Sequence, residues 1–506
     1  MPPDMLQTGS DIPKDWQAPE DHFDYTRREV MIPMRDGVKL HTVIAMPKAA
    51  HAAPILLERT PYDADHFMRT HSPYLAEAVW SGNKDWANAG YILVWQDVRG
   101  KYGSEGDYVM TRPPRGPLNP TDTDDTTDAY DTIEWLVQNL PESNGTVGMI
   151  GSSYDGWTVA MALLGPHPAL KVAAPESPMI DGWMGDDWYH HGAFRQVGLD
   201  YFSGQTSKQA AGKGIARAHR DDYTNFLEAG SAGAYALANG FEQLPWWKRF
   251  AAHPAYDAFW QLQALDKLLA QHPSAVPTMW LQGIWDQEDI YGAVHAWEAL
   301  IEAGHTQNNH LVMGPWWHSQ INRAGWNMGP LKWPGDTTAH FRQRVMIPWF
   351  DHHLRGTQLA EPLPRALVYN TVAERWDHFD DWQPASRQKP TPLYLQKDFG
   401  LGFEASAGGS DSYVSDPAKP VPYLPRPILA DDKDRWRTSL VADQRFAECR
   451  PDVLAYMTPV LTETVTVRGA PIADLYARAT GSDIDFVVKL IDVYPGIDPL
   501  QAELGG

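Results

Sequence analysis

Short apolar segments alternate with helix-length amphipathic segments over most of the first 356 residues. Most of the apolar segments are continuous, as in Ile92–Trp95 and Met279–Leu281. Continuous apolar strands separated by helices are typical of a parallel sheet that is buried on both faces. We therefore predict an α/β core with strands at 28–34, 40–47, 53–59, 90–100, 146–151, 170–176, 277–283 and 309–314.

The alternation changes twice along the chain. Between residues 176 and 274, helix-like, tryptophan-rich and polar segments predict an inserted helical cap. After residue 356, proline-rich loops and alternating strands at 462–469, 472–480 and 483–495 indicate a C-terminal β-sandwich. The last of these strands ends near Tyr494, so we expect the sandwich to be cut short. The expected domains are a core of 1–175 and 275–356, a cap of 176–274 and a sandwich of 357–506.

The chain is acidic, with a formal net charge of −22. A nucleic-acid binder needs a basic face, and an anionic membrane repels an acidic protein, so we expect neither partner. The N-terminal segment lacks the basic and apolar regions of a signal peptide, and no stretch approaches the ~18 apolar residues of a membrane span. As written, the sequence indicates a cytoplasmic protein, or a periplasmic or secreted one where an upstream signal precedes it. The single cysteine, Cys449, excludes an intrachain disulfide.

The sequence GSSYDG at 151–156 lies between a predicted strand and a predicted helix. Ser153 matches the nucleophile of a G-x-S-x-G elbow, a sharp turn that exposes the serine hydroxyl above the sheet. The match is imperfect because Asp155 stands at the second glycine position and Gly156 comes one residue later. The alternative is an ordinary turn whose serines cap the helix. The flanking elements favour the catalytic interpretation, with the Tyr154 amide facing the developing oxyanion.

A nucleophilic serine needs a histidine to take its proton and a carboxylate to orient that histidine. Asp286 follows the predicted strand at 277–283, and His318 follows the next one, in the order Ser, Asp, His that this fold uses. His305 and His310 are rivals, but neither lies after a strand. We therefore predict a triad of Ser153, Asp286 and His318.

Two other interpretations stay open at this point. A metal-dependent hydrolase would use the motifs DDWYHH and DQED, although no H-E-x-x-H spacing is present; its ligands would be Asp186, Asp187, His190 and His191. A non-catalytic relative would serve adhesion or scaffolding, but such proteins usually lack a triad member. The serine chemistry itself requires no cofactor and no metal.

Several motifs together resemble one known family. They are RTPYDA, DVRGKYGSEGDY, GSSYDGWT, GWMGDDWYHHGAFRQ, GIWDQEDIYG and GPWWH. The chain is similar to the α-amino acid ester hydrolases, β-lactam acylases in the wider group of X-prolyl dipeptidyl peptidases and cocaine esterase. The resemblance covers nearly the whole chain. It implies an α/β-hydrolase core, a helical cap and a jelly-roll domain, and its elbow has the G-x-S-Y-x-G spacing found here.

The resemblance also implies roles for residues outside the triad. The Tyr154 amide and the Tyr62 hydroxyl correspond to the oxyanion donors. Tyr62 follows the predicted strand at 53–59, where the loop after an early strand supplies the second donor, and a phenol there can replace a backbone amide. The family's carboxylate cluster for the substrate ammonium corresponds to Asp187, Glu288 and Asp289.

From these residues we expect a serine hydrolase and acyltransferase that acts on α-amino esters and α-amino acyl amides, β-lactam antibiotics included. An X-prolyl dipeptidyl peptidase or a general carboxylesterase of the same group is the alternative. The partners are then small molecules, and the resemblance implies a homo-oligomer, often a tetramer in this family.

Overall fold

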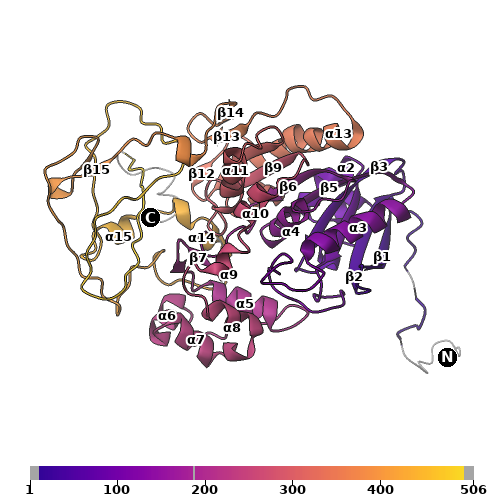
Figure 1. Cartoon of the computed structure of the whole chain (residues 1–506), viewed down its shortest axis with the longest axis horizontal. Coiled ribbons are helices and arrows are strands. Elements are labelled where there is room, and N and C mark those ends of the chain that lie inside the picture. The colour runs from indigo at the N-terminus through magenta and orange to yellow at the C-terminus, as the bar shows by residue number, and fades with distance from the viewer. Residues whose placement is uncertain (1–10, 17, 186–187, 495–506) are drawn as a thin grey trace, which may run out of the picture.

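A computed structural model describes residues 11–16, 18–185 and 188–494. At its centre lies a 10-stranded mixed sheet (Figure 1). Its central strands run parallel to their neighbours. The pairs at the two edges are antiparallel: β1 with β2 and β2 with β4 at one edge, and β13 with β14 at the other. In spatial order the strands are β1 (Tyr25–Pro33), β2 (Lys39–Pro47), β4 (Ile92–Asp97), β3 (Ala53–Thr60), β5 (Ser143–Ser152), β6 (Leu170–Glu176), β9 (Thr278–Gly283), β10 (Asn309–Gly314), β13 (Ala366–Asn370) and β14 (Arg375–Phe379).

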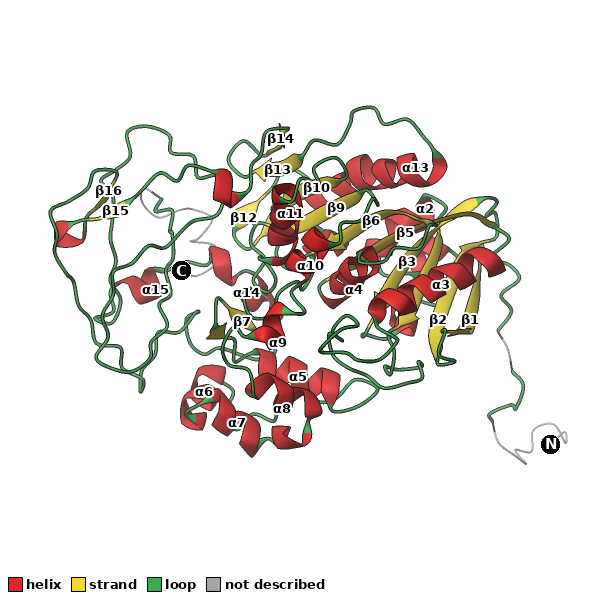
Figure 2. Ribbon diagram, viewed as in Figure 1, coloured by secondary structure: helices red, strands yellow, loops and turns green. Residues whose placement is uncertain are grey.

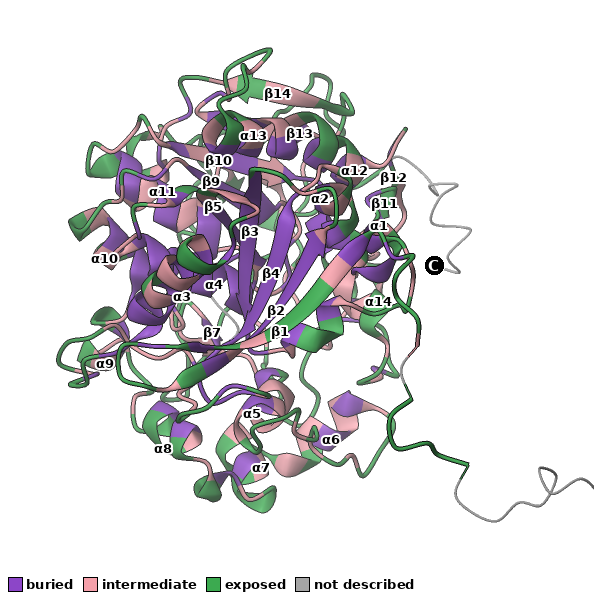
Figure 3. Ribbon diagram, turned by 90° about the vertical axis from the view of Figure 1, so that its right-hand side faces the viewer, coloured by how far each residue is buried: buried purple, intermediate pink, exposed green. Residues whose placement is uncertain are grey.

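The burial of the strands explains their sequence patterns. β3, β4 and β9 are buried at every residue, whereas the edge strand β1 is largely exposed (Figure 3). Alternate residues of β3 enter two different apolar clusters: Ile55 and Leu57 join one and Leu56 joins the other. The sheet therefore has an apolar layer on each face, as continuous apolar strands predict.

Helices cover both of these faces. One layer consists of α3 (Asp125–Asn139), α4 (Tyr154–Leu163), α10 (Leu265–Gln271) and α11 (Gly292–Glu302). The other consists of α1 (Leu75–Ala78), α2 (Lys84–Asn88), α12 (Thr337–Phe341) and α13 (Ile347–Arg355). Asp124 caps α3 reciprocally with Thr127, which fixes where that helix begins.

The inserted cap follows β6 and returns to the sheet at β9. Its apolar interior is mostly aromatic and includes Trp188, Phe202 and Trp246. Its elements are a short hairpin of β7 (Tyr189–His190) and β8 (Ala193–Phe194) and the helices α5 (Gly198–Thr206), α6 (Asp222–Ala229), α7 (Ala232–Ala238), α8 (Pro245–Ala251) and α9 (Ala258–Gln261).

The segment after residue 356 differs from the sequence-based expectation in two respects. Its first strands, β13 and β14, extend the core sheet, because buried Ala366 and Leu367 continue the apolar surface of β10. The strands expected at 462–469, 472–480 and 483–495 are not formed as far as residue 494, where the described residues end: this segment carries no strand, and its backbone finds no partner strand within the part of the chain that the structure describes. A strand without such a partner leaves its backbone groups unpaired, so alternation alone does not produce one.

The described residues after β14, 380–494, form a C-terminal lobe that consists mainly of extended loops (Figure 2). Its regular elements among the described residues are β15 (Tyr394–Leu395), β16 (Leu401–Gly402), α14 (Lys433–Arg437) and α15 (Arg445–Glu448). A short hairpin, β11 (Asn327–Met328) and β12 (Leu331–Lys332), precedes it. Among the described residues, no helix combines the length and the apolar character that crossing a membrane requires.

Candidate active site

Ser153 occupies a strained turn between β5 and α4. Its φ of 64° and ψ of −124° lie in a region that side chains with a Cβ rarely adopt. The Ser153 amide donates to the Glu176 carbonyl at 3.0 Å, and the Ser153 carbonyl accepts from the Trp157 amide at 2.9 Å. The predicted nucleophile therefore lies on a backbone conformation that the neighbouring elements hold in place.

The glycines of the elbow are required by close approaches of backbone. A Cβ on Gly151 would lie 2.5 Å from the Asp155 carbonyl oxygen, and one on Gly156 would lie 2.7 Å from the Glu176 carbonyl oxygen. The second close approach thus falls at residue 156, and position 155 is free to carry a carboxyl group. This geometry accounts for the one-residue departure from G-x-S-x-G.

Asp286 and His318 lie together on the loops after β9 and β10. The His318 Nδ1 is 3.0 and 3.1 Å from the two Asp286 carboxylate oxygens, and both side chains are buried. Burial disfavours the charged carboxylate, but the charge and hydrogen bond of His318 and further hydrogen bonds from Ser177 and the Asp289 amide hold the pKa of Asp286 below its usual value. A charged Asp286 accepting the Nδ1 proton leaves Nε2 as the base.

Two acids, Glu288 and Asp289, face the same histidine from the first turn after Asp286. The His318 Nε2 is 3.5 Å from a Glu288 oxygen and 3.8 Å from the Asp289 Oδ2. The Ser153 hydroxyl donates to that same Asp289 oxygen at 3.5 Å. The structure therefore gathers serine, histidine and two carboxylates at one point. Asp187, the third predicted member of the carboxylate cluster, lies outside the described residues.

Tyr62 and Tyr154 pack beside the elbow. Their rings meet edge to face with centroids 6.5 Å apart, and the Tyr154 hydroxyl accepts from the Thr111 amide at 2.9 Å. The Tyr62 hydroxyl shares a hydrogen bond of 2.8 Å with the hydroxyl of Tyr201, which lies on cap helix α5. The position of Tyr62 is compatible with its predicted oxyanion role, and that role stays a prediction.

The cap fastens the loop that carries the two acids. The Arg195 guanidinium donates to the Gln287 carbonyl at 3.0 Å and to the Glu288 carbonyl at 3.4 Å. The His190 Nε2 lies 3.3 Å from the Glu288 carbonyl, and burial and the charge of Arg195 lower the pKa of His190 to about 4. The backbone of the acidic loop is thus held from the cap side.

The alternatives weighed from the sequence fare differently in this geometry, because the acids Glu288 and Asp289 of the DQED motif belong to a group with metal-binding geometry, whereas, among the described residues, the histidines of the cap motif do not. The His310 Nδ1 lies 2.8 Å from the Pro364 carbonyl, and His305 follows the end of α11, where its amide donates to the Leu300 carbonyl. Within the described residues, the groups with metal-binding geometry are Glu29, His41 and Asp65, and Glu288, Asp289 and His318. His190 and His191 belong to neither group, and Asp186 lies outside the described residues.

Sequence reasoning missed three residues that contact the site. Tyr201 meets Tyr62 from a distant helix, Gln282 donates to the Asp286 Oδ2 at 3.0 Å, and Ser177 hydrogen-bonds Asp286. Gln282 lies on β9 four residues before Asp286, a spacing that carries no recognisable motif. These contacts arise from the folded arrangement of the chain, which the sequence pattern does not show.

A serine on a strained strand-to-helix turn, with a buried Asp–His pair on later strand ends, defines a serine hydrolase of the α/β-hydrolase fold. The comparisons agree with this class. The model of the X-Pro dipeptidyl-peptidase S15 family matches residues 36–320, and that of the X-Pro dipeptidyl-peptidase C-terminal non-catalytic domain matches 358–502. The chain belongs to the S15 family.

Three relatives place the chain within that family. It is 30% identical to the cocaine esterase of Rhodococcus sp. strain MB1 Bresler over 92% of this chain and 80% of that one. The structure of an α-amino acid ester hydrolase is similar with a TM-score of 0.87 and 56% identity, over 90% of this chain and 76% of that one. An aminopeptidase from a marine sediment archaeon, Thaumarchaeota archaeon, has a TM-score of 0.86 and 48% identity, over 89% and 75% of the two chains.

Proposed function

We propose that this serine hydrolase cleaves α-amino acid esters and α-amino acyl amides through an acyl-enzyme, and that it also transfers the acyl group to amines, β-lactam nuclei included. The observation that carries the proposal is the pair of carboxylates, Glu288 and Asp289, beside the nucleophile and the histidine. The relative of 56% identity that is named an α-amino acid ester hydrolase supports the same substrate class.

The first half of the reaction forms the acyl-enzyme. The Ser153 oxygen attacks the substrate carbonyl while the His318 Nε2 takes the serine proton, and Asp286 stabilises the imidazolium through Nδ1. The negative charge that develops on the carbonyl oxygen meets the Tyr154 amide and the Tyr62 hydroxyl. His318 then returns the proton to the leaving alcohol or amine.

The second half resolves the acyl-enzyme. Water, activated by His318, gives hydrolysis, and an amine in the same position gives acyl transfer. Both outcomes use the same groups, so the ratio between them depends on how well the amine competes with water for the acyl-enzyme.

The carboxylates select the substrate by charge. Glu288 and Asp289 lie close enough to His318 and Ser153 to face a group on the carbon next to the reacting carbonyl. A protonated α-amino group supplies the cation that two neighbouring carboxylates attract, and an N-acylated or anionic substrate supplies none. We include Asp187 as the third acid on the strength of the family resemblance.

The test compares two esters in one variant. Glu288→Gln should lower kcat/KM for phenylglycine methyl ester at least tenfold, because removing one partner of a desolvated ion pair costs about 2–5 kcal/mol. Hydrolysis of p-nitrophenyl acetate, which has no ammonium group, should change less than about twofold. Glu302→Gln, on the exposed end of α11, is the matched control and should affect neither ester. Equal losses on both esters would assign Glu288 to support of the triad and overturn the proposed selection.

A second candidate function is an aminopeptidase, favoured by the relative of 48% identity that carries this name. An aminopeptidase substrate also presents an α-ammonium beside the scissile carbonyl. A panel of phenylglycine methyl ester, cephalexin, an amino acid p-nitroanilide and an X-Pro anilide separates the candidates. Turnover of the p-nitroanilide alone would favour the aminopeptidase.

A further inference from the structure

Three buried carboxyl groups lie on the elements that form and adjoin the elbow. Glu58 comes from β3, Asp155 from the first turn of α4 and Glu176 from the end of β6, with 6%, 4% and 1% of their surfaces exposed. Among the described residues, none of the three forms an ion pair with a Lys, Arg or His side chain within 4 Å. The proposed chemistry uses none of these groups.

Their surroundings offer hydrogen bonds but little positive charge. Asn83 and Trp95 hydrogen-bond Glu58, Thr60 hydrogen-bonds Asp155, and the Asn322 amide donates to Glu176 at 2.7 Å. The cation that acts on the cluster is Arg342, which lowers the pKa of Glu176 but binds Asp85 at 2.8 Å. Arg59, next to Glu58 in sequence, reaches Gln96 and Asp125 on the opposite face of the sheet.

Three buried neighbouring carboxyl groups without a paired cation cannot all be charged near neutral pH. Burial and the neighbouring acids raise the pKa of Glu58 to about 8 and that of Asp155 well above its usual value. Burial raises the pKa of Glu176 to about 7. The group therefore retains protons at neutral pH.

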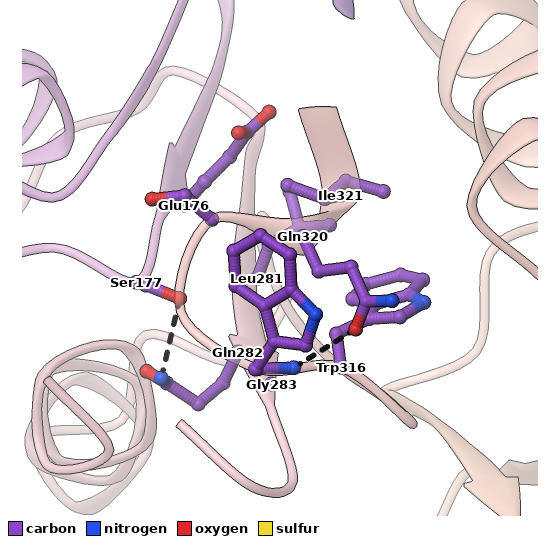
Figure 4. A pocket seen from close by; sticks show the side chains of 10 residues that line it. Glu176, Ser177, Leu281, Gln282, Gly283, Trp316, Gln320 and Ile321 are labelled. Atoms are coloured by element: carbon purple, nitrogen blue, oxygen red, sulfur yellow. Dashed lines mark hydrogen bonds between the residues drawn. The ribbon is translucent and has the colours of Figure 1, made fainter. Parts of the chain in front are cut away.

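Glu176 connects this group to the predicted triad. Its carbonyl accepts from the Ser153 amide at 3.0 Å, and its carboxyl holds Asn322, four residues after His318. The next residue, Ser177, hydrogen-bonds Asp286 and accepts from Gln282 at 3.3 Å. Figure 4 shows Glu176 and Ser177 in the wall of a small cavity together with Gln320 and Ile321 of the loop after His318.

We propose that Glu58, Asp155 and Glu176 form a protonated positioning cluster that holds the Ser153 elbow and the His318 loop in register. Loss of the protons in alkaline solution leaves buried, neighbouring like charges, and Glu176, the member bonded to both loops, moves away from them. The consequence is a loss of kcat at alkaline pH that belongs to the cluster and not to the catalytic groups. The inference rests on the proposed triad but not on the preference for amino esters.

The test follows the alkaline side of the kcat profile with p-nitrophenyl acetate, corrected for spontaneous hydrolysis. For the wild type we expect kcat to fall at least tenfold between about pH 7.5 and 9.5, reversibly and with little change in KM. Glu58→Gln cannot ionise at this position and should reduce the fall to less than about threefold. Glu142→Gln, a surface acid paired with Arg28, is the matched control and should keep the wild-type profile.

A pair of variants at Asp155 separates positioning from simple packing. Asp155→Asn keeps a neutral, hydrogen-bonding side chain and should retain kcat at pH 7 within about threefold, whereas Asp155→Leu should lower kcat at least tenfold with KM unchanged. Coinciding alkaline profiles of wild type and Glu58→Gln, or equal kcat values of the two Asp155 variants, would overturn the inference. Failure of the proposed triad gives a different result, because Ser153→Ala would then retain activity.

Discussion

At the scale of single residues, two adjacent serines of the elbow differ in surroundings. The Ser152 hydroxyl lies 2.7 Å from the Ser319 hydroxyl, so it takes part in holding the loop after His318. The Ser153 hydroxyl instead faces Asp289 in the site. Ser152 is the last residue of β5, whereas Ser153 lies on the strained turn that follows, and this change of backbone direction separates a structural serine from a reactive one.

The first prediction compares these serines. Ser153→Ala should lower kcat for p-nitrophenyl acetate by several orders of magnitude with little change in melting temperature, because the nucleophile is lost and almost no volume changes. Ser152→Ala should retain kcat within about tenfold. Steady-state kinetics and thermal unfolding of both variants check this, and the reverse order of effects would move the nucleophile by one residue.

The second prediction concerns the two tyrosines that share a hydrogen bond. When Tyr62 donates its proton to the oxyanion, its oxygen can accept from Tyr201, which strengthens Tyr62 as a donor. Tyr62→Phe should cost roughly 10²–10³ in kcat, and Tyr201→Phe a smaller factor of about 3–10, with KM less affected in both. The double variant should be no worse than Tyr62→Phe alone. An additive double variant would show that Tyr201 acts independently of Tyr62.

At the scale of elements, the sequence predicts the core sheet well because its pattern is local. The segments expected as strands before residue 320 correspond to β1–β6, β9 and β10, and the elbow lies at the junction that its motif requires. The Glu58–Asp155–Glu176 cluster had no such signal, since its members come from three elements that only tertiary packing joins. The strands expected after residue 461 could not be judged from their local pattern for the same reason, because the pairing of one strand with another is non-local.

The third prediction tests the tight junction of α4 and β6. Gly156→Ala should destabilise the protein by about 1–3 kcal/mol and lower kcat, because the added Cβ meets the Glu176 carbonyl and displaces the elbow. Gly233→Ala in α7, where nothing lies within 4 Å of the added Cβ, is the control. It should be neutral or slightly stabilising, by up to about 1 kcal/mol. Chemical denaturation of both variants gives the comparison.

At the scale of the whole molecule, the C-terminal lobe contacts both other parts. Arg426 binds Asp221 of the cap at 2.7 Å, and the Arg437 guanidinium of α14 lies 4.6 Å from the ring centre of Trp317, the neighbour of His318. These contacts join the lobe to the cap and to the loop that carries the histidine.

The fourth prediction concerns global stability and pH. The pKa of Glu58 is about 8 in the folded protein against 4.5 for a free side chain, so the folded state holds this proton more tightly than the unfolded chain. This contribution to the free energy of unfolding is present in full below pH 4.5, the pKa of Glu58 in the unfolded chain. It is lost as the pH rises through about 8, the pKa in the folded protein, and the loss is on the order of 3–5 kcal/mol. Glu58→Gln should remove much of this decline. Urea unfolding of both proteins at about pH 5 and 8.5 gives the free energy of unfolding. An equal decline between these pH values in variant and wild type would contradict the prediction.

The cap leaves the sheet after β6 and re-enters it at β9, and these two strands are immediate neighbours, with Ala173 beside Thr278 and Glu176 beside Leu281. Its two attachment points therefore remain adjacent whatever lies between them, and an exchange of the intervening segment leaves the register of every core strand intact. The fold therefore divides the surroundings of the site: the nucleophile, the histidine and the two acids lie on loops of the sheet, whereas the insert adds contacts such as those of Arg195 and Tyr201. Related proteins can accordingly change the part of the site that the insert contributes by recombination of this segment, without rebuilding the catalytic residues on the sheet.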